Sequence, residues 1–452
     1  MNLNEIRQQL DKKDFDQIFR FWDRLSLNEQ SSLLNQIKLF DWEILKRQKL
    51  LISSSETLHQ GTFEPFVDFV NSGNNIDWNE GQTRICQGQL GCLLLAGGQG
   101  TRLGSSDPKG MYPTSLINKK SLFQICSEKV LAASKQAGIP LSFAIMTSPI
   151  NSEATINYFK KNHFFGLDED QISFFTQGML PFLNDNGALF LEEKNKISTG
   201  PNGNGLCLRE FVDAGIWTKW KKKGIRYVNM ILIDNPLADP FDPELLGFHI
   251  RQNVDITSKS AEKKSPEEKV GLLVKQNGLY RVIEYSEMPD KEKNAVDPSG
   301  NLLHRCANLS LFCFTMDFID KVASKKDLPL HSAWKCAKII NDQGLSLMPT
   351  EPNAWKFETY IFDVFQYTNR IAALLYPRAQ CFAPLKNGTG DNSLETVQKA
   401  IQEREKVIIK SLTGKEPPPI PFELAADFYY PTEEMRHFWK GKSINGGYIA
   451  AL

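Results

Sequence analysis

Several features that often reveal a function are missing from this sequence. Its 452 residues hold 53 lysines and arginines against 53 aspartates and glutamates, so the formal net charge is zero. A neutral chain has no global field that attracts nucleic acid or an anionic membrane, and we expect neither as a partner. No segment approaches the roughly 18 apolar residues of a membrane-spanning helix. Any phosphate-bearing ligand must therefore be held by local groups.

Paired cysteines are also absent, because none of the eight cysteines forms a CxxC motif. The first residues, MNLNEIRQQLDKKDFDQ, lack the apolar stretch of a signal peptide. Scattered cysteines without a secretion signal are typical of reduced thiols, so we expect a cytoplasmic protein. Nothing in the sequence indicates an oligomeric state. We also find no obvious pairing of histidine with aspartate, and we interpret His163 and His249 as structural or surface residues.

What the chain does contain is enough apolar sequence for a large core, with 41% hydrophobic residues. Residues 1 to about 60 carry apolar side chains at helical spacing, which predicts a helical N-terminal region. The positions that carry this pattern include Ile6, Leu10, Ile18, Leu33, Ile37 and Ile44. Residues 61–88 are mixed and rich in Asn and Gly, as in a connecting segment.

From Gly91 onwards, short apolar runs alternate with helix-like segments, which predicts an α/β domain with a mainly parallel sheet. We expect strands at residues 92–96, 141–148, 172–177, 226–234, 270–276, 281–287 and 308–314, and helices at 121–136 and 152–161. Asn277-Gly278 predicts a hairpin, so some strands are antiparallel. The charged run 259–269 is interpreted as a solvated loop. We expect three parts: a helical region 1–88, a catalytic domain 89–378, and a small C-terminal domain 379–452 that closes over the site.

The most informative segment is LLLAGGQGTRLGSSDPKG, residues 93–110. Glycines at the end of a strand let the backbone approach a ligand, and their N–H groups can point at anionic oxygens. The segment lacks the GxxxxGK[ST] pattern of a Walker A loop. It also lacks the GxGxxG pattern of a dinucleotide site, because the next glycine after Gly100 is Gly104. Arg102 and Lys109 add positive charge directly after the glycines.

This run, with PKGMY and KKSLFQ after it, resembles the UDP-sugar pyrophosphorylases, and in particular the eukaryotic-type UDP-N-acetylglucosamine pyrophosphorylases. Further motifs similar to that family follow in the same order over roughly residues 90–390. They are QGMLP, LEEKNKIS, PNGNG, IDN, VIEYSE, ANLSLF, YIFDVF and APLKN. The resemblance implies a glycosyltransferase-A-like (Rossmann-like) catalytic domain with a mixed, mainly parallel sheet and helices on both faces.

The activity implied by the resemblance is a uridylyltransferase reaction. UTP and N-acetylglucosamine 1-phosphate would give UDP-N-acetylglucosamine and pyrophosphate, with Mg²⁺ as cofactor. Catalysis of such a reaction is mostly positioning and charge stabilisation, and no general base is strictly required. Two alternatives stay open. One is a UTP–glucose-1-phosphate or broad-specificity UDP-sugar enzyme, and the other is a non-catalytic nucleotide-sugar sensor.

The resemblance also implies roles for single residues. Arg102, Lys109 and Lys386 would contact phosphates as catalytic groups, and Asp234 would bind Mg²⁺. Nucleotide contacts would come from Ala96, Gly97, Gly98, Gly100, Gln177, Gly203 and Asn204. The sugar would be lined by Gly271, Glu284, Asn308, Tyr360 and Phe362. Asp239 and Asp242 are interpreted as turn and helix-cap residues. The sequence departs from the family pattern at Ala307, before the sugar-contacting Asn308.

Overall fold

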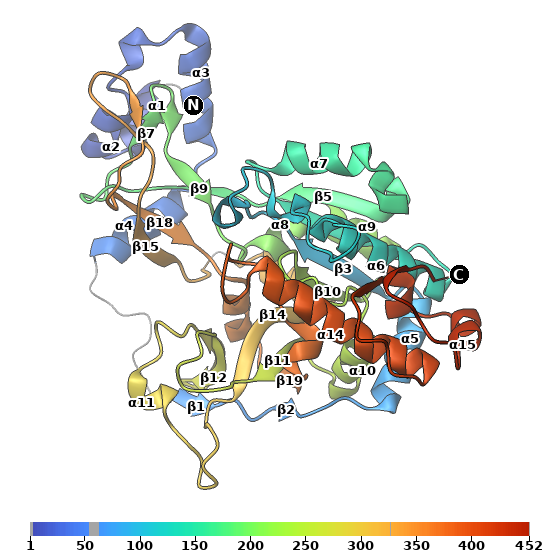
Figure 1. Ribbon diagram of the computed structural model, residues 1–452. Coiled ribbons are helices and arrows are strands. Elements are labelled where there is room, and N and C mark those ends of the chain that lie inside the picture. The colour runs from blue at the N-terminus through green and yellow to red at the C-terminus, as the bar shows by residue number, and fades with distance from the viewer. Residues whose placement is uncertain (1–2, 54–62, 326, 452) are drawn as a thin grey trace. The chain divides into compact units, whose positions relative to one another are not determined.

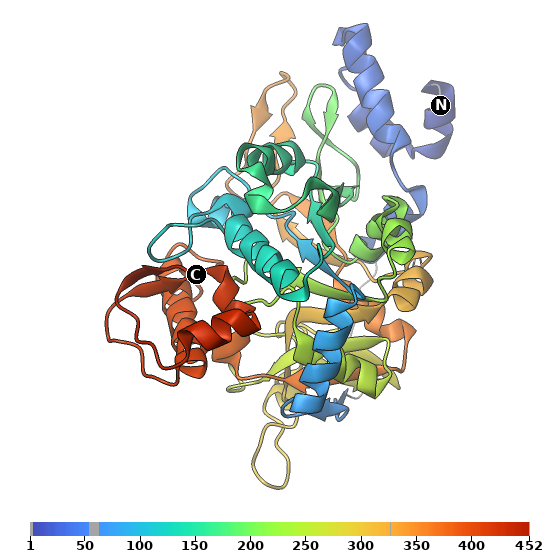
Figure 2. The same ribbon diagram turned by 90° about the vertical axis from the view of Figure 1, so that its right-hand side faces the viewer.

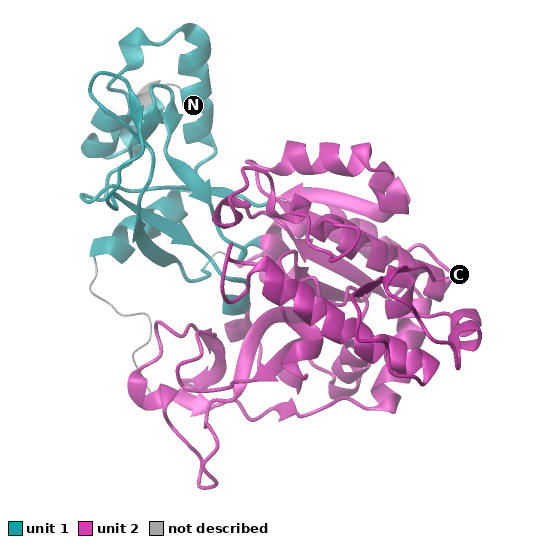
Figure 3. Cartoon of the chain, in the orientation of Figure 1, with its two compact units in different colours: residues 1–60, 177–206, 326–363 teal, residues 61–176, 207–325, 364–452 magenta. Residues whose placement is uncertain are grey.

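The computed structural model describes residues 3–53, 63–325 and 327–451. The chain forms two compact units, each built from segments that are distant in sequence (Figure 3). Unit 1 comprises residues 1–60, 177–206 and 326–363, and unit 2 comprises residues 61–176, 207–325 and 364–452. The three consecutive domains expected from the sequence stay a prediction. Within the described ranges, no helix is long and apolar enough to cross a membrane.

Unit 1 combines the N-terminal helices with short pairs of strands. The helices are α1 (Leu3–Gln9), α2 (Lys12–Ile18), α3 (Leu27–Lys38) and α4 (Trp42–Ser53), as the helical spacing predicted. The strand pairs are β6 (Met179–Pro181) with β9 (Thr199–Pro201), β7 (Leu191–Glu193) with β8 (Lys196–Ile197), β15 (His331–Lys335) with β18 (Ala354–Glu358) and β16 (Ile339–Ile340) with β17 (Ser346–Leu347). Ile18, Leu33 and Ile37 pack with Leu183 and Phe357 in one buried core.

An 11-stranded sheet forms the centre of unit 2 (Figure 1). The strands are β1 (Phe63–Pro65), β2 (Phe69–Val70), β3 (Leu90–Leu95), β4 (Phe143–Thr147), β5 (Ile172–Thr176), β10 (Tyr227–Leu232), β11 (Ile256–Glu262), β12 (Leu272–Gln276), β13 (Leu279–Ile283), β14 (Cys306–Thr315) and β19 (Ile371–Leu375). The main path runs β2-β19-β11-β14-β10-β3-β4-β5, while β12 joins β1, β13 and β14. Along the path, β14 is antiparallel to both neighbours and the other pairs are parallel. The sheet is therefore mixed and mainly parallel, as expected.

Helices cover both faces of this sheet because β3 is apolar on both sides. Cys92 and Leu94 pack with Phe123 and Leu245 of two helices on one face. The opposite face is close to α9, since a Cβ on Gly91 would lie 2.3 Å from the ring of Trp220. The main helices are α5 (Asn75–Cys86), α6 (Leu122–Ala137), α7 (Ser152–Lys161), α8 (Cys207–Asp213), α9 (Ile216–Lys222), α10 (Pro243–Gln252), α12 (Met316–Ala323), α13 (Arg378–Cys381), α14 (Leu394–Thr413) and α15 (Glu433–Trp439).

Local signals in the sequence correspond to element ends in the structure. The side chain of Ser121 caps the N-terminus of α6 by accepting from Gln124, and Gly138 ends the helix in a left-handed conformation. Asp242 caps α10 as predicted, accepting from the N–H of Leu245. β12 and β13 form the expected antiparallel hairpin. Asn277 and Gly278 both have positive φ there, 52° and 77°.

Two expectations about the second half of the chain are corrected. The charged run 259–269 begins inside β11 rather than in a solvated loop, and Lys259 is buried with its ammonium group on Asp242. The charge of this run therefore did not predict its burial, because the partner carboxylate comes from another element. The 20-residue helix α14 was not expected, although its buried positions include Val397, Ile401 and Ile409. Figure 2 shows this C-terminal part, in red, beside α6, where Gln136 donates to the Pro431 carbonyl at 3.0 Å.

Candidate active site

The loop after β3 carries the glycine-rich motif. The chain leaves the sheet at Ala96 and folds back, so that the N–H of Lys109 donates to the carbonyl of Gly98 at 3.2 Å. The buried side-chain amide of Asn151 donates to the carbonyls of Ala96 and Gly98 at 3.1 and 3.2 Å. Asn151 was not expected here. It stands at the N-cap of α7 without making a side-chain cap, so its amide is left to hold the loop.

Two glycines of this loop, Gly100 and Gly98, are explained by different physical reasons. Gly100 is buried, and a Cβ there would lie 3.1 Å from the carbonyl of Asp107, so the fold of the loop itself favours glycine. Gly98 is exposed, and a Cβ there would meet nothing within 4 Å. The N–H groups of Gly97 and Gly98 have no acceptor in the described part of the chain. Such free N–H groups beside an open position can hydrogen-bond to an anion.

Lys109 pairs with one carboxylate beside this loop and has two further cations, Lys386 and Arg102, in its vicinity. The Nζ of Lys109 lies 3.8 Å from Oδ2 of Asp234, and these side chains are only 17% and 14% exposed. Burial lowers the pKa of Lys109 and Asp234 opposes this, while the positive charges of Lys386 and Arg102 lower the pKa further. One carboxylate does not neutralise three cations. The site therefore has excess positive charge and suits a polyanion such as a triphosphate.

Asp234 has a free carboxylate oxygen. It follows β10, which is parallel to β3, so Asp234 and the glycine loop share the carboxyl edge of the sheet where such folds bind ligands. Its Oδ1 is buried and accepts no hydrogen bond from the described residues. An unsatisfied carboxylate oxygen fits Mg²⁺, which commonly takes one or two carboxylates plus phosphate oxygens. The described residues contain no cluster of three or more His, Cys, Asp or Glu that could hold a metal.

Lys386 reaches this place from a distant segment of unit 2. The preceding residue, Leu385, is fully buried and donates its N–H to the carbonyl of Asp234 at 2.7 Å. The N–H of Lys386 itself donates to the carbonyl of Asn392 at 2.8 Å, which closes a tight loop. The backbone before Lys386 is thus attached to the loop that carries Asp234.

Three of the expected sugar contacts also lie together in unit 2. The N–H of Asn308 donates to the carbonyl of Gly271 at 2.8 Å. A Cβ on Gly271 would lie 3.0 Å from Oε1 of Glu284, so glycine keeps room beside that carboxylate. The Oδ1 of Asn308 already accepts from the N–H of Ser310 at 2.9 Å, in a strand irregularity where Ser310 has a φ of 53°. The N–H₂ group of Asn308 donates to the hydroxyl of Ser310 at 3.4 Å, which leaves its second N–H available to a ligand.

The other expected contacts belong to unit 1. Gln177 and Phe362 are buried, and the rings of Tyr360 and Phe362 are 5.1 Å apart. Gly203 has a φ of 83°, and a Cβ there would lie 2.3 Å from the carbonyl of Thr359, so the fold itself requires glycine. Asn204 accepts from the N–H of Ile361 through Oδ1 at 2.9 Å. These contacts give Gly203 and Asn204 a role in the fold whatever else they bind.

Among the described residues, no histidine is found among the charges that act on Lys109 or pair with Asp234. His249 is buried on α10 with its Nδ1 2.9 Å from the hydroxyl of Thr257, and burial lowers its pKa to about 3. This agrees with a structural residue. His331 does face a carboxylate in unit 1, with Nε2 3.0 Å from Oδ2 of Asp363. The sequence did not reveal this pair, because the two residues come from different elements.

Comparison with known proteins identifies the family. Residues 44–437 match the UDPGP family, described as UTP--glucose-1-phosphate uridylyltransferase. The chain is 32% identical to a probable UDP-N-acetylglucosamine pyrophosphorylase of Dictyostelium discoideum, covering 92% of this chain and 90% of the relative. It is 34% identical to the UDP-N-acetylglucosamine pyrophosphorylase of Saccharomyces cerevisiae, over 83% and 84% of the two chains.

Solved structures agree with this assignment. A putative UDP-N-acetylglucosamine pyrophosphorylase from Entamoeba histolytica has a TM-score of 0.76 at 30% identity, over 86% of this chain and 99% of that one. The enzyme of that name from Trypanosoma brucei, solved with an inhibitor, has a TM-score of 0.76 at 26% identity, over 91% and 87%. The fold, the glycine-rich loop and these similarities lead to one conclusion: the chain belongs to the UDPGP family of nucleotidyltransferases.

Proposed function

We propose that the chain is a uridylyltransferase that joins UTP and N-acetylglucosamine 1-phosphate to give UDP-N-acetylglucosamine and pyrophosphate. The observation that carries the proposal is the pairing of Lys109 with Asp234 at the glycine loop, with Lys386 and Arg102 close enough for their charges to act on Lys109. Relatives that bear the name UDP-N-acetylglucosamine pyrophosphorylase or diphosphorylase support the choice of sugar. The eight free cysteines agree with a cytoplasmic setting for this reaction.

The chemistry needs one displacement at phosphorus. An oxygen of the sugar phosphate forms a bond to the α-phosphorus of UTP, and the bond from that phosphorus to the oxygen bridging to the β-phosphate breaks. Pyrophosphate leaves with the electron pair on the opposite side. The nucleophile is already an anion at neutral pH, so no proton has to be removed. Catalysis then depends on holding two anions together and stabilising added charge around phosphorus.

The residues of unit 2 have matching tasks in this step. The free N–H groups of Gly97 and Gly98 would bind phosphate oxygens of UTP. Lys109 would stabilise the charge that develops on the transferred phosphoryl group, and Arg102 would face the leaving pyrophosphate. Lys386 would hold the phosphates of both substrates. Asp234 would hold Mg²⁺, which neutralises phosphate charge and aligns the leaving group when bound.

The remaining residues would select the two substrates. Gln177 and Gly203 would read the uracil, since an amide offers both a donor and an acceptor to its imide edge. Glu284 would accept hydrogen bonds from sugar hydroxyls. Gly271 would leave room for the N-acetyl methyl group, and the N–H₂ of Asn308 would donate to the N-acetyl carbonyl. Asn204 would contact the ribose or the sugar, and Ala96 and Gly100 would contact the nucleotide through their backbone. Tyr360 and Phe362 would form an aromatic wall of the sugar pocket.

A direct test measures pyrophosphate release from UTP after addition of single sugar 1-phosphates. The proposal expects release with N-acetylglucosamine 1-phosphate, together with formation of the UDP-sugar. Release with glucose 1-phosphate alone would support a UTP–glucose-1-phosphate enzyme, and similar release with many sugars would support a broad-specificity enzyme. Binding of UDP-sugar without any release would contradict transfer and support a sensor.

A further inference from the structure

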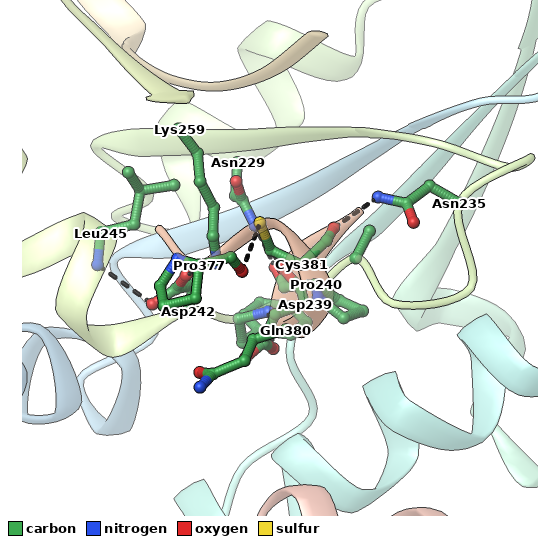
Figure 4. Close-up of polar contacts among 12 residues, drawn as sticks. Asn229, Asn235, Asp239, Pro240, Asp242, Leu245, Lys259, Pro377, Gln380 and Cys381 are labelled. Carbon is green, nitrogen blue, oxygen red and sulfur yellow. Dashed lines mark hydrogen bonds and ion pairs between the residues drawn. The ribbon is translucent and has the colours of Figure 1, made fainter. Parts of the chain in front are cut away.

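The loop after β10 and the segment before Lys386 are fastened by one buried side chain. The amide of Asn235 donates through Nδ2 to the carbonyl of Cys381 at 2.8 Å. Its Oδ1 accepts from the N–H of Ala383 at 3.0 Å. Figure 4 shows the bond from Asn235, in the loop after β10, to Cys381. Both ends of one amide are thus used on one partner segment.

A backbone hydrogen bond joins the same two segments. Two residues beyond Ala383, the N–H of Leu385 donates to the carbonyl of Asp234 at 2.7 Å. The three bonds together fix residues 381–385 against residues 234 and 235. Cys381 and Leu385 are buried in the same apolar cluster as Ile233, so water has little access to the bonds that these two residues make. Their loss would therefore leave unsatisfied polar atoms in the core.

The chemistry of the side chain explains why asparagine stands there. The site needs one donor and one acceptor on the same short side chain, and an amide provides both. Aspartate keeps the acceptor but places an oxygen against the Cys381 carbonyl. Asn235 is only 3% exposed, so it does not itself face solvent or a ligand. Its effect must pass through its neighbour Asp234 and through Lys386, which follows the segment that Asn235 holds.

We propose that Asn235 is a positioning residue for uridylyl transfer, which fixes the Lys386 ammonium group relative to the Asp234 carboxylate by fastening segment 381–385 to the loop after β10. This inference rests on the proposed function of Lys386 and Asp234 as phosphate and metal contacts. It further implies that Lys386 does not approach independently on a closing domain. The backbone before it is attached to the loop after β10 before substrate arrives.

Asn229, within β10, offers a matched control. It is also an asparagine with 3% exposure, and its amide donates to the carbonyls of Asp239 and Pro240 at 2.8 and 2.9 Å. These bonds hold a turn that is also visible in Figure 4. The described contacts of its side chain do not include segment 381–386. Asn229→Ala therefore removes similar buried hydrogen bonds without releasing Lys386.

The test is a double-mutant cycle measured by kcat and KM with UTP and N-acetylglucosamine 1-phosphate. We expect Asn235→Ala to lower kcat/KM about tenfold or more, with the same split between kcat and KM as Lys386→Ala. The double variant should be little worse than Lys386→Ala alone, because Asn235 acts through that residue. Asn229→Ala should stay within about twofold of wild type per folded molecule, and its loss should multiply with that of Lys386→Ala.

Several outcomes overturn the inference. Multiplying losses for Asn235→Ala and Lys386→Ala would show that Asn235 acts elsewhere, and equal losses for Asn235→Ala and Asn229→Ala would show a merely structural role. If Asn235→Ala does not fold, Asn235→Ser takes its place in the same cycle, because its short hydroxyl side chain cannot make both bonds of the amide. A wild type without turnover contradicts the proposed function instead. UTP affinity by calorimetry then replaces kcat/KM in the cycle, and additive losses of affinity still contradict the role of Asn235.

Discussion

The Nζ of Lys109 lies 3.8 Å from the Asp234 carboxylate, although one residue follows β3 and the other follows β10. Parallel pairing of these strands brings both residues to one edge of the sheet. Lys109 is also close enough to Lys386 and Arg102 for their charges to lower its pKa. This arrangement is electrostatically unfavourable by itself and becomes favourable when a polyanion binds.

Lys109→Ala should therefore lower kcat by about 10²–10³, since it removes a charge aimed at the reacting phosphate. Steady-state pyrophosphate release measures this. The exposed Lys160 on α7 supplies the control, and Lys160→Ala should retain wild-type turnover. Near wild-type turnover of a folded Lys109→Ala enzyme would remove Lys109 from the mechanism.

Gly98→Ala should affect UTP without affecting the fold. A Cβ there meets nothing in the protein within 4 Å, so the midpoint of thermal unfolding should not change. The methyl group would occupy space beside the free N–H groups, and we expect KM for UTP to rise about tenfold or more, about 1.4 kcal/mol. Gly110→Ala is the contrasting variant, because its Cβ would lie 2.2 Å from the Phe123 ring and should lower stability. Unchanged UTP kinetics in Gly98→Ala would contradict ligand approach at this position.

The Mg²⁺ requirement of the reaction should depend on the carboxylate of Asp234. Activity should disappear with EDTA and return with Mg²⁺, and Asp234→Asn should need a higher Mg²⁺ concentration because a neutral amide binds a hard cation more weakly. Titrating Mg²⁺ against turnover measures both effects. Asp107→Asn, at an exposed position of the glycine loop, should keep the wild-type Mg²⁺ requirement. An equal requirement in Asp234→Asn would exclude Asp234 as the ligand.

A buried carboxyl group should make stability depend on pH. Burial raises the pKa of Glu405, on α14, to about 8 from an ordinary value of 4.5. The folded protein then holds a proton that the unfolded chain releases. The stabilisation from Glu405 is complete below about pH 4.5 and is lost as pH rises through about 8.

Urea unfolding at pH 5, 6.5 and 8 tests this effect. Wild type should lose unfolding free energy over that interval at up to ~1.4 kcal/mol per pH unit from this group, and Glu405→Gln should remove that loss. Glu403 lies on the same helix with a 54% exposed side chain, so Glu403→Gln should follow wild type. Parallel curves for wild type and Glu405→Gln would show that Glu405 keeps its ordinary pKa.

The sequence predicted those parts of the fold and site whose signals are local. The apolar run 92–96 predicted β3, and Asn277-Gly278 predicted the hairpin between β12 and β13, because strand burial and turn geometry depend on neighbouring residues. The glycines and Lys109 were recognisable for the same reason. The partners of Asn151 and Asn235 are backbone carbonyls of distant segments. Since any residue provides a backbone carbonyl, no sequence pattern predicts a side-chain contact with one.

Lys259 illustrates the same limit for charge. Within the run KSAEKKSPEEK it resembles a solvated lysine, yet it lies in β11 with Asp242 as its partner. Residues 17 positions apart meet there because α10 and β11 pack together. Pairing of a buried charge depends on topology, which a local pattern does not contain.

Asn308 should determine the preference for an N-acetylated sugar. Its Oδ1 is occupied by Ser310, so the N–H₂ group would donate to the N-acetyl carbonyl. Asn308→Ala removes this donor and both contacts with Ser310. Asn308→Asp keeps the acceptor for the Ser310 N–H, but it replaces the donor by an oxygen and adds a negative charge. Both variants should reduce the preference, because leaving a ligand group unpaired costs about 1–3 kcal/mol. A preference retained in Asn308→Asp would assign Asn308 to the strand alone.

The central claim is uridylyl transfer to N-acetylglucosamine 1-phosphate. The most direct measurement is the ratio of kcat/KM for N-acetylglucosamine 1-phosphate to kcat/KM for glucose 1-phosphate, with UTP and Mg²⁺ and with formation of the UDP-sugar confirmed. We predict a ratio of about ten or more, from one unpaired hydrogen bond in the pocket. A ratio of one or below, or no pyrophosphate release with N-acetylglucosamine 1-phosphate, would contradict the account.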